Sequence, residues 1–213
     1  TGIGVKAKLA SNNVAIVSGE AQIIDKNTVR CGEETYEGEN LILCTGSETF
    51  IPPIPGVETV NYWTHRDALD NKELPASLAI VGGGVIGMEF ASFFNSLGVQ
   101  VTVVEMLDEI LGGMDKELSA LLRAEYAKRG IKFLLSTKVV GLSQTEGAAV
   151  VSYENAEGSG SVVAEKLLMS VGRRPVTKGF GLENLNLEKT ERGAVKWMRR
   201  CRPPCLVFMF AVT

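Results

Sequence analysis

The stretch LAIVGGGVIGMEF, residues 78–90, decides how the rest of the sequence is interpreted. Its first four residues are apolar and predict a buried strand, and the next six have the spacing G-x-G-x-x-G. Residues 85–97 predict a helix that follows the glycines at once. Four apolar residues fall on one stripe of this helix, namely Ile86, Phe90, Phe93 and Leu97. Strand, glycine turn and helix in this order are typical of a Rossmann-like α/β domain.

Each glycine of the motif has a physical task. Gly82 permits the tight turn, Gly84 lets the main chain approach a pyrophosphate, and Gly87 lets the helix pack closely on the strand. Main-chain N–H groups at the helix N-terminus, together with the helix dipole, favour a bound anion. The predicted nucleotide contacts of this turn are Gly82, Gly83, Gly84, Val85, Ile86 and Gly87. The alternative is a glycine-rich turn that binds nothing.

An acidic residue follows at the expected distance. Glu105 ends a second predicted strand, residues 101–104, and stands 18 residues after Gly87. A carboxylate at this place accepts hydrogen bonds from the adenosine ribose hydroxyls and repels a 2′-phosphate. Residues 106–109 supply no Arg or Lys that would bind such a phosphate. The pattern predicts NAD and not NADP, the alternative being a solvated glutamate at a strand end.

The remaining sequence extends this plan in both directions. Before the glycine turn we expect the end of a helix at 3–10, short strands at 14–17, 21–24 and 28–31, a strand buried on both faces at 40–46, and a domain-crossing segment at 51–56. After it we expect a helix capped by Asp115 and closed by Gly130, a strand at 131–135, and a β-meander from 139–142, 149–153 and 162–170.

Composition excludes several classes of function. The net charge of −3 gives no basic surface for nucleic acid, and no stretch approaches the roughly 20 apolar residues that span a bilayer. The four cysteines form no secreted disulfide framework, and no signal peptide opens the chain, so the expected compartment is cytoplasmic. The chain begins with Thr1 rather than Met, and we expect it to start partway through a larger protein.

Three motifs in order carry a resemblance to a known family. They are LCTGS at 43–47, GGGVIGME at 82–89 and SVGRRP at 170–175, and they resemble the pyridine nucleotide–disulfide oxidoreductases. VVEMLDEIL at 103–111 and GRRP at 172–175 are most similar to the dihydrolipoamide dehydrogenase branch. The resemblance extends from residue 1 to about residue 196. Other branches remain open, namely the mercuric, glutathione and CoA-disulfide reductases and the NADH oxidases.

The resemblance implies a division into domains and a set of site residues. Residues 1–60 would be part of an FAD domain, 61–174 the NAD-binding domain, and 175–196 a partial return to the FAD domain. Val139 would pack on the adenine, Gly172 would approach the nicotinamide, and Glu89 would face the nicotinamide–flavin contact. The residues implied to line the FAD are Ala21, Thr45 and Gly46.

The resemblance also implies an activity for the intact enzyme. Electrons would pass between a lipoyl-bearing protein, a redox disulfide, FAD and NAD⁺ in a homodimer. The 213 residues contain no second glycine fingerprint and no C-x₄-C pair, and the only histidine, His65, is expected on a surface or linker. We therefore expect this chain to bind NAD without FAD and without turnover. The remaining alternative is an inert structural fragment with a vestigial groove.

The last residues depart from the family pattern. Residues 197–213 read WMRRCRPPCLVFMFAVT, where the family would continue with a strand and a flavin-binding Gly-Asp. The sequence VDEKMQTSVPGVYVCGD resembles what the family has at this place, and we chose codons that encode it. When the first base of this coding sequence is dropped, the shifted frame encodes residues 197–212. We therefore interpret the tail as a shifted reading frame, in which Cys201 and Cys205 form neither a redox pair nor a zinc site. The apolar segment 206–212 is expected to pair with an exposed sheet edge or to aggregate.

Overall fold

The computed structural model describes residues 2–191, 193–196 and 207–209. The chain forms two compact units, a larger one of residues 49–173 and a smaller one of residues 1–48 and 174–213. The sequence placed the first boundary at residue 60, but the crossing segment packs within the larger unit. There, the main-chain N–H of Leu142 donates to the carbonyl of Pro55, 2.8 Å away.

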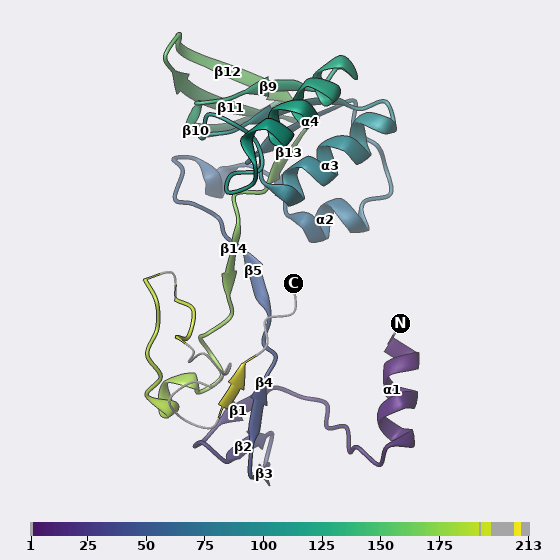
Figure 1. Ribbon diagram of the computed structural model, residues 1–213, viewed down its shortest axis with the longest axis vertical. Helices are drawn as coiled ribbons and strands as arrows, with labels where there is room; N and C mark the ends of the chain where they lie inside the picture. The colour runs from purple at the N-terminus through teal and green to yellow at the C-terminus, as the bar shows by residue number, and fades with distance from the viewer. Residues whose placement is uncertain (1, 192, 197–206, 210–213) are drawn as a thin grey trace. The chain divides into compact units, whose positions relative to one another are not determined.

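A five-stranded parallel sheet forms the centre of the larger unit (Figure 1). Its strands are β6 (Tyr62–Trp63), β13 (Lys166–Met169), β7 (Ser77–Val81), β8 (Gln100–Val104) and β9 (Lys132–Leu134), in that spatial order. Because β8 and β13 flank β7 on opposite sides, the chain reverses its winding direction at β7. In open α/β sheets, ligands bind outside the carboxyl ends of the strands at such a reversal.

Alternation along β7 builds the two layers that cover the sheet. Leu78 and Ile80 pack into the core beneath the helices, whereas Ala79 and Val81 pack into the core beneath the β-meander. The helices are α2 (His65–Asp70), α3 (Val85–Ser96) and α4 (Lys116–Lys128). The antiparallel meander consists of β10 (Lys138–Thr145), β11 (Ala148–Asn155) and β12 (Gly158–Ala164). These four of the five β7 residues are at most 5% exposed, so the strand is buried on both faces.

Both main helices begin and end where the sequence predicted. The Asp115 carboxylate caps α4 by accepting hydrogen bonds from the N–H groups of Glu117 and Leu118, at 2.9 and 3.1 Å. At the end of α3 the N–H of Gly98 donates to the carbonyl of Asn95, 3.0 Å away. These bonds satisfy main-chain groups that a helix end leaves without partners.

The smaller unit is built from short elements around a small core. They are α1 (Gly2–Ser11), the antiparallel sheet β1 (Ala21–Ile23), β2 (Thr28–Cys31) and β3 (Glu34–Glu37), β4 (Leu41–Leu43) paired in parallel with β15 (Val207–Met209), and η2 (Leu182–Leu185). Strands β5 (Ser47–Thr49) and β14 (Arg173–Pro175) pair with each other, and η1 (Val57–Thr59) belongs to the larger unit. The buried core residues are Ile23, Leu43, Leu182 and Val195.

Several sequence-based expectations need correction. Residues 14–17 form no strand, and β4 is shorter than predicted, with the Ile42 side chain 58% exposed instead of buried. The predicted strand 162–170 is two elements, because β12 ends the meander and β13 joins the parallel sheet. Most of the predicted tail lies outside the described residues. Within those residues, no helix is both long and apolar enough to cross a membrane.

Candidate nucleotide-binding site

The glycine turn joins the carboxyl end of β7 to α3 by close packing. Gly82 has φ of +107°, and a Cβ atom there would lie 2.3 Å from the carbonyl oxygen of Ser170, just beyond β13. A Cβ atom at Gly87 would lie 2.2 Å from the carbonyl oxygen of Gly82. Both positions therefore exclude any side chain, as the sequence predicted for a tight turn and for close packing of the helix.

Gly84 differs from its neighbours because it faces open space. It is the N-cap residue of α3, no side chain caps the helix there, and no atom lies within 4 Å of a Cβ built on it. Its φ of −71° suits any residue, so backbone strain does not explain the glycine. Open space beside an uncapped helix N-terminus fits a pyrophosphate, which the terminal N–H groups would bind. Val85 and Ile86 form the first turn of that helix.

Glu105 is held against the glycine turn by both of its carboxylate oxygens. Oε2 accepts from the N–H of Gly83 at 2.5 Å, and Oε1 accepts from the N–H of Leu107 at 2.8 Å. The main chain of Glu105 continues the sheet edge, since its N–H donates to Leu134 and its carbonyl accepts from Thr137. A carboxylate has about four acceptor directions, so these two bonds leave acceptor capacity for ribose hydroxyls.

Two further predicted nucleotide contacts belong to the same unit. Val139 is half-buried and packs against the meander core, two residues after Thr137, which bonds Glu105. Gly172 has open space around its Cβ position, and its carbonyl accepts from the N–H of Phe50 at 2.9 Å. It follows Ser170 by two residues, and Ser170 contacts Gly82. The chain therefore brings both segments to the edge where the glycine turn lies.

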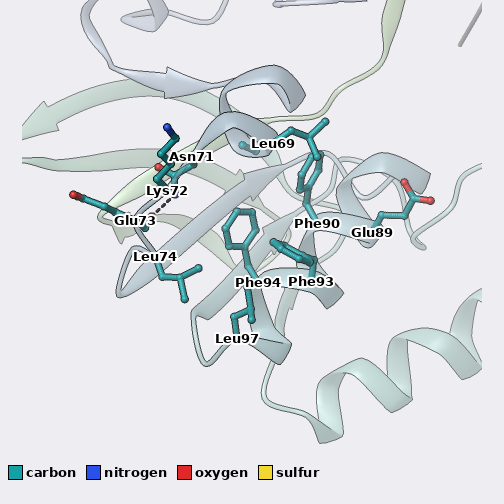
Figure 2. A pocket seen from close by; sticks show the side chains of 11 residues that line it. Leu69, Asn71, Lys72, Glu73, Leu74, Glu89, Phe90, Phe93, Phe94 and Leu97 are labelled. Carbon is teal, nitrogen blue, oxygen red and sulfur yellow. Dashed lines mark hydrogen bonds between the residues drawn. The ribbon is translucent and has the colours of Figure 1, made fainter. Parts of the chain in front are cut away.

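Glu89 lies on the exposed side of α3, at the rim of an apolar groove of about 490 Å³ (Figure 2). Its carboxylate points away from the three phenyl rings of the groove. Those rings belong to Phe90, Phe93 and Phe94. The structure buries Phe90 and Phe94, whereas Phe93 and Leu97 of the stripe noted in the sequence remain 55% and 47% exposed. The groove is lined by α2, α3 and the segment 71–74, and includes none of the glycines of the turn.

The three residues predicted to line the FAD all lie in the smaller unit. Ala21 is exposed in β1, and the Thr45 hydroxyl donates to the carbonyl of Val176 at 2.8 Å. The carbonyl of Gly46 accepts from the N–H of Val176 at 3.0 Å. No atom lies within 4 Å of a Cβ built on Gly46, so a cofactor has room to approach the main chain there.

His65 has polar partners that the sequence did not predict. Its Nδ1 lies 3.0 Å from the Thr49 hydroxyl, and its Nε2 lies 3.1 Å from Nη1 of Arg173. Partial burial, followed by the positive charge of Arg173, lowers the pKa of His65 from its ordinary value. The half-buried histidine therefore stands between the chain segments that enter and leave the larger unit.

Comparison with known proteins gives a family match over most of the chain. The family profile described as pyridine nucleotide-disulphide oxidoreductase matches residues 2–211, which is further than the resemblance predicted from the motifs. Dihydrolipoyl dehydrogenase of Geobacillus stearothermophilus is 34% identical over 93% of this chain and 43% of its own length. Human mitochondrial dihydrolipoyl dehydrogenase is 36% identical over 90% of this chain and 40% of its own length.

A solved structure has a similar fold. The HOCl-induced flavoprotein disulfide reductase RclA from Escherichia coli matches with a TM-score of 0.86 and 29% identity, over 96% of this chain and 47% of that chain. The chain thus spans less than half the length of the relatives it matches. With a family match that covers nearly every residue, the chain belongs to the pyridine nucleotide-disulphide oxidoreductase family.

Proposed function

We propose that the larger unit binds NAD(H) on the glycine turn, with the pyrophosphate at Gly84 and the adenosine ribose at Glu105. The observation that carries the proposal is the open space at Gly84. At Gly82 and Gly87, by contrast, a Cβ atom would lie 2.3 and 2.2 Å from a main-chain carbonyl oxygen. Packing gives no reason for a glycine at position 84, whereas close approach of a phosphate does. Val139 and Gly172 extend the proposed site toward the adenine and the nicotinamide.

For the whole protein we propose the activity of the dihydrolipoyl dehydrogenase relatives. Dihydrolipoamide on a lipoyl-bearing protein would be oxidised, and its electrons would pass through a redox disulfide and FAD to NAD⁺. The flavin, when bound, supplies the electron-transfer chemistry, and the protein supplies position. Ala21, Thr45 and Gly46 would line the flavin, and Glu89 would face its contact with the nicotinamide. The names of the relatives and the match to a flavoprotein disulfide reductase support this class of reaction.

For the 213-residue chain by itself we propose binding of NAD(H) without turnover. Neither a C-x₄-C pair nor a second glycine fingerprint occurs among its residues, so it carries no redox disulfide of this family. Titration calorimetry of the purified chain with NADH tests the proposal. Saturable binding with one nucleotide per chain is expected. Absence of binding at millimolar NADH would contradict it and favour a vestigial groove.

A further inference from the structure

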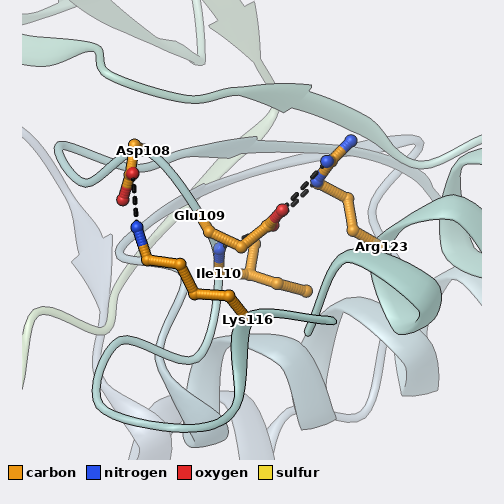
Figure 3. A network of polar contacts seen from close by, with 5 residues as sticks. All are labelled: Asp108, Glu109, Ile110, Lys116 and Arg123. Carbon is orange, nitrogen blue, oxygen red and sulfur yellow. Dashed lines mark hydrogen bonds and ion pairs between the residues drawn. The ribbon is translucent and has the colours of Figure 1, made fainter. Parts of the chain in front are cut away.

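We propose that the ion pair between Glu109 and Arg123 is a positioning device for the nucleotide site. It would fix residues 107–111, whose main chain holds both the glycine turn and Glu105. This inference rests on the proposed NAD(H) site and adds to it two residues that contact no nucleotide themselves. Glu109 lies in the connection between β8 and α4, and Arg123 lies on α4 (Figure 3).

Arg123 and Glu109 form a bidentate ion pair, called the fork, which restricts both side chains. Nε of Arg123 lies 2.7 Å from Oε1 of Glu109, and Nη2 lies 2.9 Å from Oε2. Oε1 also accepts from the N–H of Ile110 at 2.9 Å. The Glu109 side chain is only 13% exposed, and the hydrogen bonds from Arg123 lower its pKa. A bidentate pair of this kind fixes geometry as well as charge.

The fork is connected to the proposed site through the residues on both sides of Glu109. From Glu109 the chain runs through Ile110, which is 1% exposed, to Leu111, whose N–H donates to the carbonyl of Gly83 at 2.8 Å. In the other direction it reaches Leu107, whose N–H donates to the Glu105 carboxylate. The same carboxylate accepts from the N–H of Gly83. A shift of residues 107–111 would therefore move the glycine turn and Glu105 together.

The segment does not hold this conformation by its own preference. Leu111 has φ of +56°, in the left-handed region that a leucine rarely occupies. Such a residue keeps its conformation only where its surroundings impose it. The contacts that hold the segment include burial of Ile110 and the fork that anchors Glu109 to α4. The N–H of Ser136 also donates to the carbonyl of Leu107, 2.8 Å away. Loss of the fork removes the side-chain anchor of the segment to α4, so fewer contacts oppose the strain at Leu111.

A second ion pair in the same connection provides a matched control. Nζ of Lys116 lies 2.7 Å from Oδ2 of Asp108, the same distance as the shorter bond of the fork. Its side chains are 75% and 71% exposed, and exposed pairs contribute little to stability or position. Both cations lie on α4 and both pair with the β8–α4 connection, so replacing either removes one positive charge from the same region.

The test compares Arg123→Gln with Lys116→Gln in the full chain. Dissociation constants for NADH and ADP-ribose are measured together with hydrogen exchange at the Leu107 and Leu111 amides in the nucleotide-free protein. Arg123→Gln is expected to raise both constants by about tenfold, and to speed exchange at both amides. Lys116→Gln is expected to change both constants less than about twofold. Arg123→Lys keeps the charge but not the fork. Its dissociation constants and exchange rates should lie between those of Arg123→Gln and those of the unchanged protein.

A double variant guards against a folding defect. Glu109→Gln with Arg123→Gln leaves no unpaired charge, so it should fold and still show faster exchange and weaker nucleotide binding. If Arg123→Gln and the double variant match Lys116→Gln in exchange and in affinity, the positioning role is refuted. If the unchanged protein binds neither NADH nor ADP-ribose, the proposed nucleotide site fails instead. The two failures are thus distinguishable.

Discussion

The carboxylate of Glu105 accepts a hydrogen bond from the main-chain N–H of Gly83, and this bond joins the end of β8 to the turn that follows β7. The contact places a negative charge beside the uncapped N-terminus of α3. It orients Glu105 before any nucleotide is present, because its second oxygen is held by Leu107. A group oriented in advance loses less entropy on binding.

Glu105 should determine the choice between the two nicotinamide cofactors. We expect the chain to bind NADH more tightly than NADPH, since the carboxylate would repel a 2′-phosphate. Glu105→Ala should weaken NADH binding by about 1–2 kcal/mol, the scale of a lost charge-assisted hydrogen bond. Calorimetry with both nucleotides is the measurement, with the exposed Glu117→Ala as control. Equal or tighter binding of NADPH by the unchanged chain would contradict the assignment.

Substitutions at two glycines of the turn should have different effects, one mainly on NADH affinity and the other on stability. Gly84→Ala places its methyl group in open space, so it should lower the free energy of unfolding only by about 0.5–1 kcal/mol, because alanine is a poorer N-cap than glycine. NADH affinity should fall by about tenfold. Gly87→Ala forces a methyl group against the Gly82 carbonyl and should destabilise the chain by at least about 1–3 kcal/mol. Urea unfolding and NADH titration measure the two effects. A Gly84→Ala chain with unchanged affinity would place the pyrophosphate elsewhere.

The start of α2 should make stability depend on pH. The Asp67 carboxylate accepts hydrogen bonds from the N–H and the hydroxyl of Thr64, and these bonds lower the pKa of Asp67. A lowered pKa means that the stabilisation is complete above the unfolded value of 3.8 and is lost as pH falls through the folded value. Asp67→Asn should therefore lower the free energy of unfolding by about 1 kcal/mol at neutral pH and by less near pH 3. Urea unfolding at both pH values is the measurement. Asp70→Asn serves as control at the other end of the helix.

The purified chain should carry no flavin and should not oxidise dihydrolipoamide. Its residues include neither the flavin glycine fingerprint nor the cysteine pair of the family. An absorption spectrum and an assay of NAD⁺ reduction by dihydrolipoamide check this expectation. A yellow protein absorbing near 450 nm, the expected flavin band, would refute it.

The tail should be the product of a shifted reading frame. Sequencing the gene and its genomic source around codon 197 is the measurement, and a one-base difference is expected there. The family match extends to residue 211, and Val207–Met209 pairs with β4, so a native in-frame tail is the competing explanation. An unshifted genomic frame that encodes residues 197–213 would end the proposal. Residues 197–206 and 210–213 lie outside the described part of the chain.

Local spacing was sufficient to predict the elements that carry the proposed nucleotide contacts. The structure has the turn at Gly82, the helix start at Gly84 and the strand end before Glu105 where the spacing predicted them. The cap at Asp115 was predictable for the same reason, because its partners are two and three residues away. The order and type of most strands followed from runs of apolar residues between turns.

Only the tertiary structure decided which surfaces meet. Periodicity placed Phe93 and Phe90 on one stripe, yet the sheet buries Phe94 with Phe90 and leaves Phe93 exposed. A helix of mixed apolar residues offers several faces, and the sheet beneath it selects one. Likewise, β13 pairs with β6 and β7 and not with the meander. Because these strands lie far from β13 in sequence, no local pattern could indicate the pairing. The fork between Glu109 and Arg123 joins residues 14 apart on different elements, and no local pattern indicates which charges will meet in space.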